Sequence, residues 1–206
     1  MTKTPPNLRD LLARHRTTAI TAVIAALTLL AWSNRFMQDD AFISFRYARH
    51  LVEGHGLVWN IGERIEGYTN FLWVLLSAGG LALGADPVVW TQVLGIALFA
   101  ATLALTWQLV RETGADDLTA LAVVVLVGTN YSVSIYATGG LETQLQAFFL
   151  VGLAAVVCSS ARSGEWKERE VLLASLAMAG ALLTRLDSAI VCAAAAAFCL
   201  DRKSVV

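Results

Sequence analysis

Charged residues are scarce in this chain of 206 residues, where Asp, Glu, Lys and Arg together make up 15%. Soluble domains carry about 25% of these residues, so the scarcity excludes an ordinary soluble protein. The formal net charge is -1. A chain with this charge lacks the basic surface that binds a nucleic acid backbone, and nucleic acid is therefore excluded as a partner.

Cysteine and proline are also scarce, with three of each. Cys158, Cys192 and Cys199 lie in apolar runs without the spacing of a zinc site or a disulfide framework, so we expect them to be small core residues. The sequence has no Walker A loop, HExxH, GxSxG or glycine-rich dinucleotide motif. These absences leave no standard catalytic motif.

Hydrophobic residues, in contrast, make up 57% of the chain, and the mean hydropathy is +0.63. A bilayer core about 30 Å thick needs about 20 apolar residues in a helix. The best candidate spans are residues 17–32, 88–110, 118–137 and 144–161. Shorter apolar runs, more typical of tilted, re-entrant or interfacial helices, are residues 71–84, 171–184 and 188–200. The sequence therefore predicts an all-α, polytopic transmembrane bundle of about five to six membrane helices.

The distribution of Lys and Arg predicts how these helices cross the membrane, because cytoplasmic loops collect basic residues. If residues 71–84 cross, most of the Lys and Arg fall outside, against this rule. If they lie along the outer surface and the last apolar stretch breaks at 185–187, most fall inside. We therefore expect a cytoplasmic basic head at 1–16, a membrane domain at 17–206 and an extracytoplasmic loop with juxtamembrane helices at 37–84.

In this arrangement several ionisable residues come together at the outer membrane surface. They are Asp39, Asp40, Glu142 and Asp187, with Arg46 and Arg185. Ionisable residues beside membrane segments are rare and often functional, although an Asp pair can also be only a helix cap. A carboxylate can act as a general base on a hydroxyl, and an arginine can bind a phosphate. Together they suit group transfer from a lipid-linked phosphate to a hydroxyl.

The first outer loop has an amphipathic helix with one apolar face, formed by Ala41, Phe45, Ala48 and Val52. We expect Asp39 or Asp40 to cap this helix and Gly54 to end it. Thr69 or Asn70 is expected to cap the next helix.

The same loop resembles a known family. Within residues 39–73 it contains DDAFISFRYA, GHGLVWN and GERIEGYTNFLW. These stretches resemble the first outer loop of GT-C type glycosyltransferases, and are most similar to actinobacterial cell-wall arabinofuranosyltransferases that use decaprenyl-phosphate-linked arabinose. Residues 140–143 resemble the family's short acidic second outer loop. Residues 183–187 resemble its LTRPD/E turn, with Leu186 where proline is usual.

The resemblance implies an enzyme of the bacterial plasma membrane, with its site outside the cytoplasm. It would transfer a sugar, with arabinofuranose as the candidate, from a polyprenyl-phosphate donor to a cell-envelope glycan acceptor. By the same resemblance, Asp39 is expected to activate the acceptor hydroxyl, and Asp40 to orient it or to hold a divalent cation. Arg46 and Arg185 are expected to bind the donor phosphate. Residues expected to shape the substrate site are Glu66, Tyr68, Asn70, Glu142 and Asp187.

The resemblance also implies that this chain is the N-terminal part of such an enzyme, since family members continue with further spans. Two other interpretations stay open. One is a catalytically inactive, truncated membrane protein or assembly partner. The other is a small transporter, which would place charged residues near the membrane midplane and contain two related halves.

Overall fold

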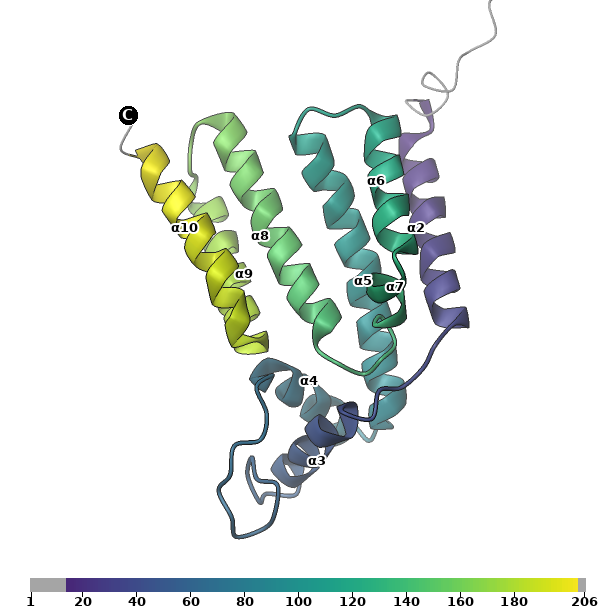
Figure 1. The fold of residues 1–206 in the computed structure, drawn as a ribbon, viewed down its shortest axis with the longest axis vertical. Helices are drawn as coiled ribbons and strands as arrows, with labels where there is room; N and C mark the ends of the chain where they lie inside the picture. The colour runs from purple at the N-terminus through teal and green to yellow at the C-terminus, as the bar shows by residue number, and fades with distance from the viewer. Residues whose placement is uncertain (1–13, 204–206) are drawn as a thin grey trace, which may run out of the picture.

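The computed structural model describes residues 14–203, with side chains as far as residue 199, and this part of the chain contains helices and loops without a β-strand. The longer helices run side by side as a bundle (Figure 1). They are α2 (Arg16–Ser33), α5 (Pro87–Glu112), α6 (Asp117–Thr129), α8 (Thr143–Ser163), α9 (Glu168–Thr184) and α10 (Ala189–Lys203). Helices α3 (Ala41–Val52) and α4 (Phe71–Ala82) lie at one end of this bundle.

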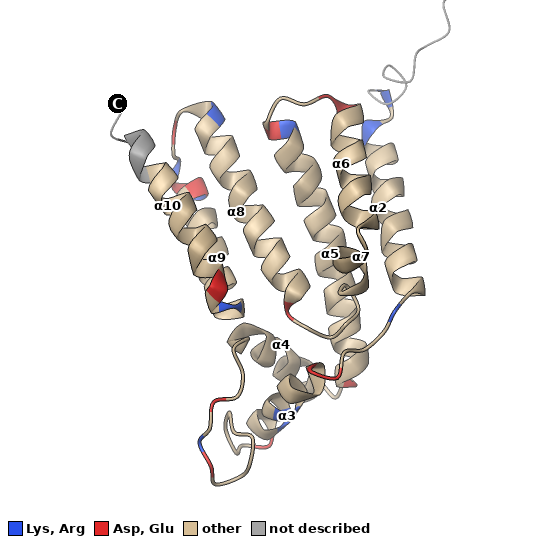
Figure 2. Cartoon of the chain, in the orientation of Figure 1, with Lys and Arg blue, Asp and Glu red and all other residues tan. Residues whose placement is uncertain are grey.

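Three of these helices, α2, α5 and α8, are long and apolar enough to cross a membrane. Helices α4 and α6 and residues 186–199 are apolar but shorter. The acidic and basic residues gather at the two ends of the bundle and in the loop after α3 (Figure 2). The prediction of an all-α membrane bundle is confirmed. Most of the basic head predicted at 1–16 lies outside the described residues.

The apolar run at 118–137 differs from its prediction as one continuous helix. Helix α6 ends at Thr129, and a separate short helix, α7 (Tyr131–Ile135), follows it. Between them, Asn130 has an extended ψ of 124°, and its side chain accepts a hydrogen bond from the N–H of Val133 at 3.2 Å. The prediction was wrong because an apolar composition does not show where a polar side chain starts a new turn.

The predicted break at 185–187 is confirmed. Helix α9 ends at Thr184, Arg185 is extended with φ -156° and ψ 131°, and Leu186–Ser188 form a 3-10 turn before α10. Helix α4 has only 12 residues, or about 18 Å at the usual rise per residue. Its length and its place at the end of the bundle fit the predicted interfacial helix (Figure 1). Which membrane surface this end faces stays a prediction.

Two apolar clusters hold the bundle together. The cluster that joins α2, α5 and α6 contains Leu27, Ala31, Phe99, Leu103 and Val124. The cluster that joins α8, α9 and α10 contains Leu153, Ala174, Ala181 and Cys192. Helices α8 and α9 pack closely at Gly180, where a Cβ would lie 2.4 Å from the ring of Phe149. The burial of Cys192 agrees with its predicted core position.

Helix α3 packs on α4 through the face that the sequence predicted. Ala41, Phe45 and Ala48 are buried, whereas Val52, at the last turn, is exposed. Tyr47 is also buried and packs with Val74 and Ala78 of α4. The backbone ends the helix as predicted, because Gly54 follows it with a φ of 83°.

Candidate active site

The end of the bundle beside α3 and α4 is built around the turn at 139–142, between α7 and α8. Gly140 has a φ of 77°, and a Cβ there would lie 2.5 Å from Sδ of Met37, so only glycine fits without displacement. The N–H of Gln38 donates to the carbonyl of Gly139 at 3.0 Å. The indole Nε1 of buried Trp73 in α4 donates to the carbonyl of Gly140 at 2.9 Å. The turn therefore docks the first loop, residues 34–70, and α4 against the start of α8.

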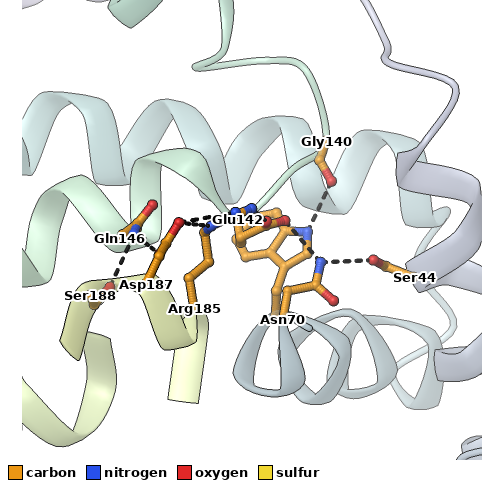
Figure 3. A network of polar contacts seen from close by, with 9 residues as sticks. Ser44, Asn70, Gly140, Glu142, Gln146, Arg185, Asp187 and Ser188 are labelled. Atoms are coloured by element: carbon orange, nitrogen blue, oxygen red, sulfur yellow. Dashed lines mark hydrogen bonds and ion pairs between the residues drawn. The ribbon is translucent and has the colours of Figure 1, made fainter. Parts of the chain in front are cut away.

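A cluster of hydrogen-bonded polar side chains lies directly after this turn (Figure 3). We call it the Glu142 network; its members are Ser44, Asn70, Glu142, Gln146, Arg185, Asp187 and Ser188. Oε1 of Glu142 is 2.9 Å from Nη1 of Arg185, and Oε2 accepts a hydrogen bond from Nδ2 of Asn70 at 2.8 Å. Since the Glu142 side chain is only 9% exposed, these partners replace the water that its carboxylate loses on burial.

Asn70 links this carboxylate to α3, because its Nδ2 also donates to Oγ of Ser44 at 3.0 Å. Asn70 occupies the N-cap position of α4 but makes no side-chain cap hydrogen bond. The predicted capping role was wrong for this reason: the amide is used for a contact distant in sequence. The structure thus brings together two residues of the predicted site, Asn70 and Glu142.

Arg185 is held on its other side by Asp187, whose Oδ2 lies 3.1 Å from both Nε and Nη2. Oδ1 of Asp187 accepts a hydrogen bond from Nε2 of Gln146 at 2.8 Å, and the same nitrogen donates to Oγ of Ser188 at 3.0 Å. The hydrogen bond to Glu142 raises the pKa of Arg185, which stays charged. Its side chain is 40% exposed, and Nη1 and Nη2 retain N–H donors for an anion.

Asp39 and Asp40 lie at the start of α3, between Gln38, which donates to the carbonyl of Gly139, and Ala41, which lies close to Gly140. Both side chains are exposed. Asp40 is the N-cap residue, yet its side chain makes no cap hydrogen bond. The prediction of a side-chain cap at this position was therefore wrong. Within the part of the chain that the structure describes, neither carboxylate makes a side-chain hydrogen bond or an ion pair, so both are accessible to a substrate.

Arg46 lies within the first loop rather than in the Glu142 network. Its Nε donates to the carbonyl of Trp59 at 2.8 Å, and Nη2 donates to Oδ1 of Asn60 at 3.0 Å. The guanidinium carbon lies 4.3 Å from the centroid of the Trp59 ring. The structure therefore places the two predicted phosphate ligands, Arg46 and Arg185, in separate contacts.

Glu66 and Tyr68 lie in the last part of the first loop. Tyr68 packs edge-on against Tyr47, with the ring centroids 4.8 Å apart. Burial, with a smaller contribution from Glu66, raises the pKa of Tyr68, whose hydroxyl therefore stays protonated. Glu66 and Arg64 line a small cavity of about 290 Å³ in the loop. These contacts fix the loop without joining Glu66 or Tyr68 to the Glu142 network.

No group of three or more His, Cys, Asp or Glu side chains in the described residues could hold a metal ion. Asp39 and Asp40 by themselves supply adjacent carboxylates. A Mg²⁺ ion is commonly bound by one or two carboxylates together with substrate phosphates. The carboxylates fit that pattern only with a bound phosphate, and the cation at Asp40 stays a prediction.

Comparison with curated proteins finds two similar proteins. Over 62 residues, 27% of this chain, it is 40% identical to a terminal beta-(1->2)-arabinofuranosyltransferase of Corynebacterium glutamicum. Over 63 residues, 30% of this chain, it is 40% identical to a protein of the same name from Mycobacterium tuberculosis. Part of this chain resembles arabinofuranosyltransferases. The resemblance expected from the sequence is confirmed, and the matched part spans 9% and 10% of those arabinofuranosyltransferases. No model of a known protein family and no solved structure matches the chain.

Three members of the Glu142 network were absent from the predicted site: Ser44, Gln146 and Ser188. Gln146 follows Glu142 by four positions, the spacing that places two side chains on one face of a helix. That spacing is a signal from which its position could have been predicted. Ser44 carries no such signal, because it reaches the network through Asn70, a residue 26 positions away.

Proposed function

We propose that this chain is part of a membrane glycosyltransferase of GT-C type. It transfers a sugar, arabinofuranose by the similarity above, from a polyprenyl-phosphate donor to a hydroxyl of a cell-envelope glycan. The observation that carries the proposal is the placement of the exposed Asp39–Asp40 pair beside the turn that leads into the Glu142–Arg185 ion pair. A lipid-linked donor needs such a site at the end of an apolar helical bundle, where its phosphate can leave the hydrocarbon core.

In the transfer step, Asp39 acts as the general base and accepts the proton of the acceptor hydroxyl. The hydroxyl oxygen forms a bond to the anomeric carbon of the donor sugar while the bond from that carbon to the phosphate oxygen breaks. The phosphate leaves on its polyprenyl chain with the electron pair of the broken bond. Because attack comes from the opposite face, the anomeric configuration is inverted.

Arg185 stabilises the negative charge on the leaving phosphate through its remaining N–H donors. Glu142 and Asp187 hold its guanidinium from two sides, so the charge is placed before the substrate arrives. Arg46 is a second candidate ligand of the phosphate. Asp40 orients the acceptor or holds a divalent cation, which would neutralise phosphate charge. Glu66, Tyr68 and Asn70 are proposed to shape the sugar pocket.

We place this end of the bundle outside the plasma membrane, because that orientation leaves most Lys and Arg residues in cytoplasmic loops. A small transporter is less well supported. Transporters bind their substrates near the midplane, whereas the charged residues drawn in Figure 2 gather at the ends of the helices.

The test is sugar transfer from a polyprenyl-phosphate donor in membranes that contain the full chain. Asp39→Asn is expected to lower the rate about 10²- to 10⁴-fold, the usual contribution of a general base. Asp86→Asn is a matched control: Asp86 is exposed and caps α5 by accepting from the N–H of Val89, and asparagine is as good a cap. Its activity should equal that of the wild type.

Transfer that survives in the Asp39→Asn/Asp40→Asn double variant would refute the proposed base. Absence of transfer by the folded, inserted wild-type chain would favour the catalytically inactive or assembly-partner interpretation.

A further inference from the structure

Gln146 has no part in the transfer step above, yet its side-chain amide connects α8 to the turn after α9 (Figure 3). Nε2 donates to Oδ1 of Asp187 at 2.8 Å and to Oγ of Ser188 at 3.0 Å. We propose that Gln146 is a positioning residue, which orients Arg185 toward the donor phosphate by acting through Asp187. The proposal rests on the proposed function, in which Arg185 binds that phosphate.

Asp187 needs such a partner because its side chain is 55% exposed. An exposed ion pair holds two flexible side chains weakly, since water competes for both charges and each side chain loses rotamer freedom. Gln146 fixes Oδ1, which leaves Oδ2 directed at Nε and Nη2 of Arg185. As a neutral amide, Gln146 orients the carboxylate without adding a negative charge that would repel a phosphate.

The contact with Ser188 holds the backbone that carries Arg185. Ser188 is buried, and its N–H donates to the carbonyl of Arg185 at 3.1 Å, which closes the 3-10 turn. One side chain of α8 therefore holds both the carboxylate beside the guanidinium and the turn that follows it. Without the Gln146 side chain, the guanidinium of Arg185 should adopt several orientations, and only one of them binds the phosphate. The affinity for the donor should therefore fall.

The substitution Gln146→Leu removes both hydrogen bonds while keeping a similar size. We expect the KM for the donor to rise about tenfold, equivalent to about 1.4 kcal/mol, with kcat unchanged at saturating donor. Gln146→Glu should raise KM further, because it places an oxygen against the carboxylate of Asp187. Gln108→Leu is the matched control: Gln108 is exposed near the other end of α5 and makes no side-chain hydrogen bond in the described part of the chain.

A second substitution, Leu186→Pro, should restore part of the affinity in the Gln146→Leu background. Leu186 is 73% exposed and opens the 3-10 turn, and its N–H has no acceptor among the described residues. Arg185 before it is already extended, with φ -156° and ψ 131°, the region that the residue before a proline favours. Proline at position 186 would therefore restrict the backbone of the 3-10 turn, which the side chain of Gln146 holds through Ser188.

Binding is measured with a polyprenyl monophosphate, added to the full chain in lipid nanodiscs, together with donor KM and kcat. Arg185→Gln should abolish binding, Gln146→Leu should weaken it about tenfold, and Leu186→Pro should recover part of the loss. If Arg185→Gln binds the lipid as the wild type does, both the phosphate role and the positioning role are overturned. If Arg185→Gln loses binding but Gln146→Leu and Gln146→Glu do not, the positioning role alone is overturned. A fall in kcat with an unchanged KM in the Gln146 variants would also overturn it.

Discussion

Replacement of Asn70 by aspartate separates two roles that this residue could have. If Asn70 served only as the N-cap of α4, Asn70→Asp would be neutral, because Asn and Asp are about equally good caps. The structure instead uses its Nδ2 as a donor to Glu142 at 2.8 Å and to Ser44 at 3.0 Å. A carboxylate at this position cannot donate, and it places a second negative charge beside Glu142.

The expected loss of stability follows from these contacts. A hydrogen bond to a charged group is worth about 1.5–3 kcal/mol, and the bond to Ser44 adds about 1 kcal/mol. The new carboxylate is also repelled by Glu142, in a site where Asn70 is buried. Uptake of a proton limits this repulsion, so we expect a total destabilisation of about 3 kcal/mol near pH 7. Asn70→Ala, which removes the donor without adding charge, should cost less.

The pH dependence has a defined sign. The carboxyl introduced at position 70 has its pKa raised by Glu142 above the value of about 3.9 for an unfolded chain. A group with a raised pKa in the folded state loses stability as the pH rises through that pKa. The deficit of Asn70→Asp relative to the wild type should therefore be smaller near pH 4 than near pH 7.

The assay is equilibrium unfolding in detergent micelles, followed by tryptophan fluorescence at both pH values. Trp73 is fully buried and contacts the same turn, so it reports on this region. A stability of Asn70→Asp within about 0.5 kcal/mol of the wild type near pH 7, the usual effect of a neutral surface change, would refute the argument.

Two further predictions concern the turn at 139–142 and the orientation of the bundle. Gly140→Ala should destabilise the chain by about 2–4 kcal/mol in the same unfolding assay, because the left-handed backbone and the contact with Met37 add their costs. Gly164 is the matched control, because it has a φ of 75° and an added Cβ would have nothing within 4 Å. Gly164→Ala should therefore lower the stability by only about 1–2 kcal/mol. Equal losses of stability in the two variants would contradict a steric cost from the contact with Met37. A cysteine introduced as Glu165→Cys should react with an impermeant reagent only in permeabilised cells; labelling of intact cells would reverse the proposed orientation.

The helices that the sequence predicted correctly are those whose boundaries depend on burial in the bilayer. Helices α5 and α8 follow long apolar runs, and the break at Arg185 occurs where charged residues interrupt such a run. The apolar runs and the break follow from one constraint, because charged side chains are costly inside the bilayer and are rare within a spanning helix. The gathering of Glu142, Arg185 and Asp187 at one end was predicted instead from the distribution of Lys and Arg, which favoured the topology in which their two turns lie on the same side.

The predictions that were wrong concern polar residues at the ends of helices. Asp40 and Asn70 have good N-cap chemistry, yet neither side chain caps its helix. For Asn70 the competing partner is Glu142, 72 positions away, and a local pattern contains no information about such a contact. Asn130 shows the opposite case: its local hydrogen bond to Val133 divides an apolar run that looked continuous.

The two sides of the proposed chemistry are joined through Glu142 and the turn before it. The proposed base, Asp39, belongs to the first loop, which docks on the Gly140 turn and reaches Glu142 through Asn70. The proposed phosphate ligand, Arg185, follows α9 and reaches the same carboxylate from the other side. Asn70→Asp should therefore disturb both sides, so that kcat falls and the donor KM rises together. Gln146 contacts only the Arg185 side, and its substitution should raise KM alone. If kcat falls equally in Asn70→Asp and in the Gln146 variant, the Asp39 side and the Arg185 side do not act separately.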